Sequence, residues 1–382
     1  MERIKMSERN EQMKKQSGSV VRVLAGLLVI LALSCVLIAV LQHRIRTHSW
    51  RLFSRTNLSG LGKAMQIYGK DFDGKAPPAQ DVSKLKRIGV NYRVPRTDSD
   101  LRYWLENMVS YHRFSNDEVR AATGWPETKV EGAKRMFDIR PDNRPRRAEG
   151  APLLVLPYPG GRHPRIGFLE GAIDPQRETK FSVFTPWDVN SYVVVDVPEA
   201  IWSNLGLTYL AHTHIDTIWA KQGITLKRLE WNRRADGRLD IRRKLPNGIE
   251  FAVKVTPTKD AVLMEMRLAN GTGEKLSDLR IQNCVMTKMA KGFEQQTNEN
   301  KVLKDPYAAC RSGDGKRWII TAWQGCHRTW ANEKCPCFHS DPKFPDLEPG
   351  QESTLKGWLW FYEGMDIEAE FSRIEETGWR EK

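Results

Sequence analysis

A run of nineteen residues without a charged side chain, from Val23 to Leu41, constrains this chain more than any other feature of its sequence. A helix of that length spans roughly 28 Å, close to the hydrocarbon thickness of a bilayer, and satisfies its own backbone hydrogen bonds. No small-residue cleavage pattern follows Leu41. The run therefore predicts an uncleaved transmembrane helix, with membrane lipid as its partner.

Basic residues on either side of this run predict its orientation. Residues 1–22 contain six Lys or Arg near the span, against four Arg residues just beyond it. The positive-inside rule then favours a cytoplasmic amino terminus. We expect a single pass through the inner membrane and a carboxyl-terminal domain in the periplasm.

Charge is unevenly distributed along the sequence. Residues 1–150 have 28 Lys plus Arg against 16 Asp plus Glu, a net charge of +12, whereas residues 151–382 have 32 against 31, a net charge of +1. The basic excess thus lies beside the membrane, where anionic headgroups or an acidic envelope polymer would explain it. Nucleic acid is accordingly a disfavoured partner.

Changes in composition divide the chain into parts. Pro77 and Pro78 end one helical pattern, Gly124 separates two short ones, and residues 139–150 are rich in Arg and Pro. Residues 98–138 are predicted to form three short helices, with Ser115 as the cap of the second. The last two, on either side of Gly124, resemble a helix-turn-helix. We expect a basic tail (1–22), a transmembrane helix (23–41), a juxtamembrane helix with a linker (42–97), a small helical module (98–138), an exposed linker (139–150) and a large β domain (151–382).

The β domain is predicted from side chains that alternate between apolar and polar, most clearly in Glu250 to Val255 and Val262 to Leu268. Asp-Gly and Asn-Gly pairs predict tight turns with positive φ at Gly237, Gly248, Gly271 and Gly315. Further strands are expected at 153–156, 166–169, 180–184, 192–197, 208–212, 226–231, 279–286, 318–323 and 354–361. About a dozen antiparallel strands indicate a large antiparallel β-sandwich, so the fold class is mainly β.

One histidine pair suggests metal chemistry. His212 and His214, one residue apart in a predicted strand, would project to the same face. Two imidazoles so placed can share a divalent metal ion, with Asp216, His339 or Asp341 as a further ligand. Histidines that bind a ligand without metal, and histidines with a purely structural role, are the other interpretations.

Five cysteines, an odd number, follow residue 150. Thiolates and imidazoles between Cys326 and His339 could form a zinc site, although their spacing matches no established zinc pattern. In an exported domain disulfides are the preferred interpretation. They would be drawn from Cys310, Cys326, Cys335 and Cys337.

Ten of the thirteen tryptophans also follow residue 150. Indole rings pack on the CH faces of sugars, and carboxylates and amides bind sugar hydroxyls. Trp219 and Trp323 are candidate stacking faces, with core packing as the alternative, and Asn298 belongs to a polar stretch at 294–300 that forms either a binding rim or a solvated loop. The predicted ligand site comprises His212, His214, Asp216, Trp219, Asn298, Trp323, His339 and Asp341.

Three segments resemble known groups of proteins. The segment from about Leu207 to Tyr362, with hairpins around 246–249 and 269–272, looks like the supersandwich of galactose-mutarotase-like proteins. The stretch from about Leu101 to Trp379 is similar to uncharacterised membrane-anchored envelope proteins of planctomycete-type bacteria, and residues 57–68 resemble the amino-terminal segment of pseudopilins. The first resemblance implies a sugar-like ligand, but no motif here matches the mutarotase catalytic His and Glu.

These features predict a membrane-anchored extracytoplasmic protein that binds a carbohydrate or another polar envelope ligand through its sandwich. One alternative is a metal-dependent polysaccharide hydrolase or lyase, in which His212 and His214 hold the ion and Asp216 or Glu294 acts as base. The other is a membrane-tethered DNA-binding regulator. Whether the protein is an enzyme, and which residues would then be catalytic, is left open by the sequence.

Overall fold

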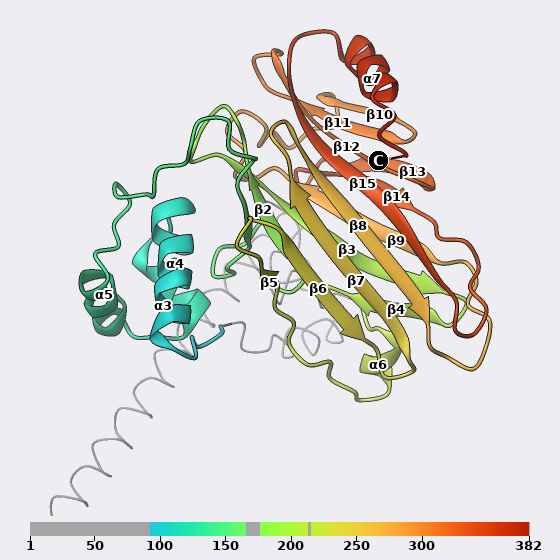
Figure 1. Cartoon of the computed structure of the whole chain (residues 1–382), viewed down its shortest axis with the longest axis horizontal. Coiled ribbons are helices and arrows are strands. Elements are labelled where there is room, and N and C mark those ends of the chain that lie inside the picture. Colours follow the sequence, from blue (N-terminus) through green and yellow to red (C-terminus); the bar gives the residue numbers. More distant parts are fainter. Residues whose placement is uncertain (1–91, 166–175, 213–214, 382) are drawn as a thin grey trace, which may run out of the picture. The chain divides into compact units, whose positions relative to one another are not determined.

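The computed structural model describes residues 92–165, 176–212 and 215–381 (Figure 1). The predicted transmembrane helix, the predicted juxtamembrane helix, the expected strand at 166–169 and His214 lie outside these ranges. Within the described ranges, no helix has the length and hydropathy needed to span a membrane.

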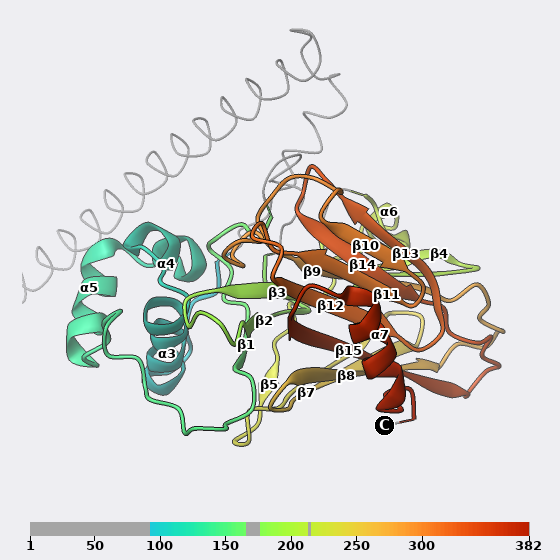
Figure 2. The same cartoon turned by 90° about the horizontal axis from the view of Figure 1, so that it is seen from above.

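Two antiparallel sheets form a sandwich in the described part of the chain, as Figures 1 and 2 show from two directions. Sheet A has seven strands in the order β1-β2-β3-β9-β14-β13, with β4 paired to β3, and sheet B has eight in the order β10-β11-β12-β15-β8-β7-β6-β5. The strands are β1 (Val155–Pro157), β2 (Lys180–Phe184), β3 (Tyr192–Ser203), β4 (Gly206–Leu210), β5 (Asn232–Arg233), β6 (Leu239–Lys244), β7 (Ile249–Pro257), β8 (Ala261–Asn270), β9 (Arg280–Met286), β10 (Lys301–Lys304), β11 (Tyr307–Arg311), β12 (Arg317–Trp323), β13 (Cys326–Asn332), β14 (Cys337–Pro342) and β15 (Glu352–Glu363).

Alternating side chains explain how the two sheets pack. Phe251 and Met264 of sheet B contribute to the same buried apolar cluster as Val193 and Val195 of sheet A. The intervening residues of β3 and β9, such as Val194 and Cys284, belong to a second cluster on the opposite face of sheet A. Because successive residues point to opposite faces, sheet A therefore has an inner apolar face and an outer face that is also covered.

The expected sandwich is confirmed, with corrections in detail. The strand predicted at 180–184 coincides with β2, and Gly237, Gly248 and Gly315 have φ angles of 84°, 99° and 76°. Gly271 is not among the residues with positive φ. It begins the long connection from β8, which ends at Asn270, to β9, so no tight hairpin turn forms there.

The strand expected at 226–231 is absent from the described structure, because side chains rather than a neighbouring strand bind its backbone. The carboxylate of Glu178 accepts a hydrogen bond from the backbone NH of Leu229 at 3.0 Å, and the guanidinium of Arg243 donates to the carbonyl of Lys227 at 2.7 Å.

The three helices expected in the small module are confirmed as α3 (Asp98–Leu105), α4 (Asn116–Thr123) and α5 (Glu127–Met136), and a π-helical turn, η1 (Glu106–Tyr111), continues α3. Ser115 and Glu118 form a capping box on α4, and Gly124 ends that helix in the left-handed conformation. Two further helices, α6 (Ile218–Lys221) and α7 (Ile367–Glu376), were not expected from the sequence. DNA binding by α4 and α5 stays a prediction.

His112 connects the helical module to sheet A. Its Nδ1 lies 2.8 Å from the carbonyl oxygen of Asn107, and its Nε2 lies 2.7 Å from the hydroxyl of Ser182 on β2. The ring is 1% exposed and lies edge-on to the aromatic rings of Phe184 and Tyr192. Burial is the main reason that the pKa of His112 falls from 6.5 to about 3.

This burial predicts a loss of stability in acid. The unfolded chain, with its higher histidine pKa, takes up a proton that the native state excludes, so stability is present above pH 6.5 and is lost as the pH falls toward 3. When the pH falls from about 7 to about 5, the free energy of unfolding should decrease by about 2 kcal/mol because of His112 alone. Urea unfolding of the full chain and of His112→Gln at both pH values measures this decrease, which the variant should lack. Equal losses in the two proteins would contradict the assignment.

Candidate functional site

A fully buried carboxylate, Glu199, lies at the centre of a polar cluster on the outer side of sheet A. It lies within an irregularity in the pairing of β3 with β9, between Asp196 and Ala200. Nε2 of His212 lies 2.6 Å from Oε1 of Glu199, and the amide of Gln282 on β9 donates to Oε2 at 2.8 Å. The guanidinium of Arg165 forms an ion pair with the same carboxylate. We call these four residues the Glu199 cluster.

Opposing effects set the ionisation of this carboxylate. Burial alone would raise the pKa of Glu199, but the charge of Arg165 and the hydrogen bond from His212 outweigh it and hold the pKa well below its usual range. Glu199 is therefore ionised and bound by donors from three segments of the chain. A second buried ion pair, between Lys180 and Asp196 at 2.9 Å, lies on the adjacent strands β2 and β3.

His339 on β14 extends this polar layer. Its Nδ1 lies 3.9 Å from Oε2 of Glu199 and 2.6 Å from the carbonyl oxygen of Asn283. The indole of Trp330 stacks on the His339 ring, with 3.8 Å between ring centroids and 8° between planes. The indole NH of Trp330 donates to the buried carboxylate of Asp341 at 2.7 Å, which also pairs with Arg328 at 2.6 Å.

Two cysteines and His339 form the group best suited to a metal ion among the described residues. One ligand atom each from Cys284, Cys337 and His339 lies within 4.8 Å of the other two, and all three residues are buried. A hydrogen bond from Cys284 lowers the pKa of the Cys337 thiol well below its usual range, whereas burial raises that of Cys284. In the described part of the chain, the disulfide candidates Cys310, Cys326, Cys335 and Cys337 are not joined by disulfide bonds.

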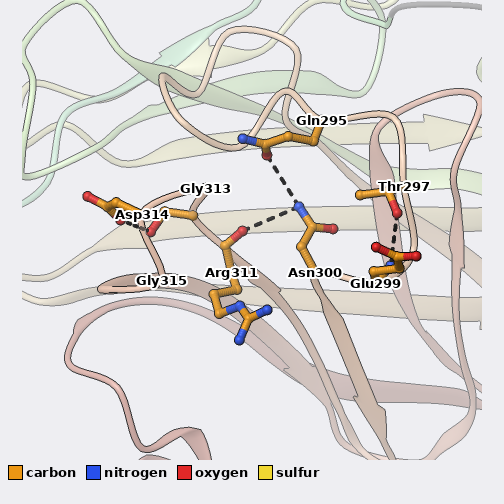
Figure 3. Close-up of a pocket in the computed structure, with 9 residues that line it drawn as sticks. Gln295, Thr297, Glu299, Asn300, Arg311, Gly313, Asp314 and Gly315 are labelled. Atoms are coloured by element: carbon orange, nitrogen blue, oxygen red, sulfur yellow. Dashed lines mark hydrogen bonds between the residues drawn. The ribbon is translucent and has the colours of Figure 1, made fainter.

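A separate pocket of about 400 Å³ lies where the loop before β10 meets the β11–β12 turn (Figure 3). The Asn300 amide donates to Oε1 of Gln295 and to the backbone carbonyl of Arg311, both at 3.3 Å, and so joins the two sides. We call this the loop pocket. Its lining consists of Gln295, Thr297, Glu299, Asn300, Arg311, Ser312, Gly313, Asp314 and Gly315.

The structure brings together only part of the predicted ligand site. His212 and His339 converge on Glu199, and Asp341 follows His339 on the same face of β14. Asp216 precedes α6 and is partly buried, and Asn298 is exposed in the loop before β10.

Trp219 and Trp323 need a correction, because neither offers an open face for stacking. They are 4% and 1% exposed and pack in the core between the sheets. Trp323 covers Gly357 of β15, so closely that a Cβ added there would lie 2.2 Å from its ring. The core interpretation of these two residues therefore holds in the structure.

Glu199, Arg165 and Gln282 were not among the residues predicted from the sequence. A signal for Glu199 was nevertheless present, since Asp196 and Glu199 are acidic residues within the otherwise apolar run from Tyr192 to Ile201. A charge in such a run must find partners when the strand is buried. The sequence gives no comparable indication for Arg165 or Gln282, which come from distant segments.

No protein-family model matches the chain, and no curated protein is similar to it. Among solved structures, a protein from Escherichia coli K12 provisionally described as an aldose 1-epimerase shares 10% identity over 36% of this chain and 69% of its own, with a TM-score of 0.27. A polysaccharide lyase shares 10% identity over 56% of this chain and 33% of its own, with a TM-score of 0.30. A protein from the human microbiome, provisionally described as a kojibiose phosphorylase, shares 8% identity over 62% of this chain and 36% of its own, with a TM-score of 0.33. Scores this low support no argument about the fold family or the function of this chain, and the expected likeness to mutarotase-like sandwiches stays a prediction.

The Glu199 cluster predicts a large effect of a nearly isosteric change. In Glu199→Gln, Arg165 loses the carboxylate that balances its charge, so the free energy of unfolding should fall by about 3 kcal/mol. Glu352→Gln is the matched control, because its carboxylate is 60% exposed where it pairs with Arg267, and a change below about 1 kcal/mol is expected there. Guanidinium unfolding of the full chain measures both. Similar effects for the two variants would show that the buried pairing contributes little.

Proposed function

We propose that this chain binds a carbohydrate, or another polar ligand of the cell envelope, in the loop pocket of its sandwich. The supporting observation is the lining. None of the described residues around this cavity of about 400 Å³ has an aliphatic or aromatic side chain. A cavity of this size accepts a small ligand, and such a lining favours one that is hydroxylated over one that is apolar.

The lining groups suit sugar hydroxyls, which both donate and accept hydrogen bonds. The carboxylates of Glu299 and Asp314 accept, the Arg311 guanidinium donates, and the amides of Gln295 and Asn300 can do both. Two carboxylates against one guanidinium give the lining a net negative charge. A neutral sugar is therefore preferred over a uronate, whose carboxylate would face like charges.

The location of the protein is a further part of the proposal. The uncharged run from Val23 to Leu41 would anchor the chain in the inner membrane, and the charge imbalance around it would put the sandwich in the periplasm. In that compartment the pocket would meet envelope polysaccharides.

Calorimetric titration tests the pocket. The full chain, purified in detergent, is titrated with a neutral gluco-oligosaccharide and with the corresponding glucuronate oligomer, and the neutral ligand should bind more tightly. Arg311→Gln should weaken that binding about tenfold, because the variant loses a charge-assisted hydrogen bond to the sugar. Glu299→Gln should reduce the preference for the neutral ligand.

Arg234→Gln is the matched control, since Arg234 is a 58% exposed arginine that pairs with Asp240, outside the pocket lining. It should leave the affinity unchanged. Failure of both oligosaccharides to bind, or an equal effect of Arg234→Gln and Arg311→Gln, would refute the assignment of the pocket.

Reporter fusions after residue 382 test the location. A reporter that is active only outside the cytoplasm should be active there, because a single span with a cytoplasmic amino terminus exports the carboxyl end. Activity of a reporter that works only in the cytoplasm would overturn the periplasmic part of the proposal.

A further inference from the structure

We propose that Cys284, Cys337 and His339 bind a zinc ion on the outer face of sheet A. Strand geometry puts the three side chains together. Cys337 and His339, two residues apart, project to one face of β14, while Phe338 between them packs in the core. Cys284 on the paired strand β9 shares a buried cluster with Cys337. The three residues are 0 to 1% exposed, and their ligand atoms lie within 4.8 Å of one another.

The spacing between Cys337 and His339 matches two ligands of a tetrahedral zinc ion. Sγ of Cys337 and Nε2 of His339 are 3.5 Å apart. Zinc bonds of about 2.3 Å to sulfur and about 2.0 to 2.1 Å to nitrogen, at a tetrahedral angle, would put these two atoms about 3.6 Å apart. These two side chains therefore need little rearrangement to hold the ion, and Cys284 is close enough to complete the set.

The surroundings orient the imidazole as in known zinc sites. Nδ1 of His339 lies 2.6 Å from the backbone carbonyl of Asn283 and donates its proton there. Nε2 then faces Cys337, and the stacked indole of Trp330 prevents the ring from rotating away. A backbone carbonyl that fixes the tautomer of a metal-binding histidine is the usual partner outside the ligand set.

Charge and softness favour zinc over harder ions. Zn²⁺ would displace the protons that Cys284, Cys337 and His339 hold between them to solvent, and two thiolates with a neutral imidazole would then leave the buried ion and its ligands without net charge. Thiolate ligands select zinc over magnesium or calcium. Cys335, buried in the same cluster, is a candidate for a fourth ligand.

Metal analysis of the full chain tests the proposal. Protein purified with a reducing agent and loaded with ZnCl₂ should retain about one zinc per chain after gel filtration. Cys284→Ser and Cys337→Ser should lose it, whereas Cys326→Ser should keep it, because the half-buried Cys326 at the start of β13 lies outside the group. Replacement by Co²⁺ in the wild-type chain should give the visible absorption bands of a tetrahedral ion with thiolate ligands.

The cobalt spectrum reads the ligands directly, so the proposal stays testable if a serine variant fails to fold. Wild-type protein that retains no zinc, or an octahedral cobalt spectrum, would overturn it. So would a disulfide between Cys284 and Cys337, identified by peptide mapping of protein purified without reductant, because that bond would remove both thiolate ligands.

Discussion

The ionised carboxylate of Glu199 is the constraint on which the outer face of sheet A depends. A fully buried charge is tolerated only when partners replace its water shell, and leaving it unpaired would cost several kcal/mol. Arg165, His212 and Gln282 supply those partners from three segments separated by up to 117 positions along the sequence. One acidic side chain therefore fixes the mutual placement of β3, β9 and His212, which lies two residues beyond the end of β4.

The same strands serve two packing layers because their side chains alternate. Val195 of β3 and Phe338 of β14 face the core between the sheets, while Asp196 and His339 face the outer layer. His112 packs against that outer layer from the helical module. The polar groups of sheet A are thus buried by protein, which makes ion pairs and hydrogen bonds a requirement of the fold.

Features of the fold that depend on residues close in the sequence could be predicted, and features that depend on distant residues could not. The cap at Ser115, the turn at Gly248 and the alternation in β8 depend on near neighbours, and each was expected correctly. Residues 226–231 also mix apolar and polar side chains, yet distant side chains bind their backbone and no strand forms there. Trp323 could not be assigned to core or surface, because an indole suits both and only the opposite strand, with Gly357, decides.

The two proposed sites are physically connected through one turn. The amide of Gln296, next to the pocket residues Gln295 and Thr297, donates to the backbone carbonyl of Lys334 at 2.8 Å. Lys334 belongs to the turn between β13 and β14, which leads directly to Cys337. A zinc ion that ties Cys337 to Cys284 would restrain this turn, and a restrained turn holds one wall of the loop pocket in place. Metal binding would therefore reduce the ordering that a ligand must impose on the pocket, so zinc and ligand should each raise the affinity for the other.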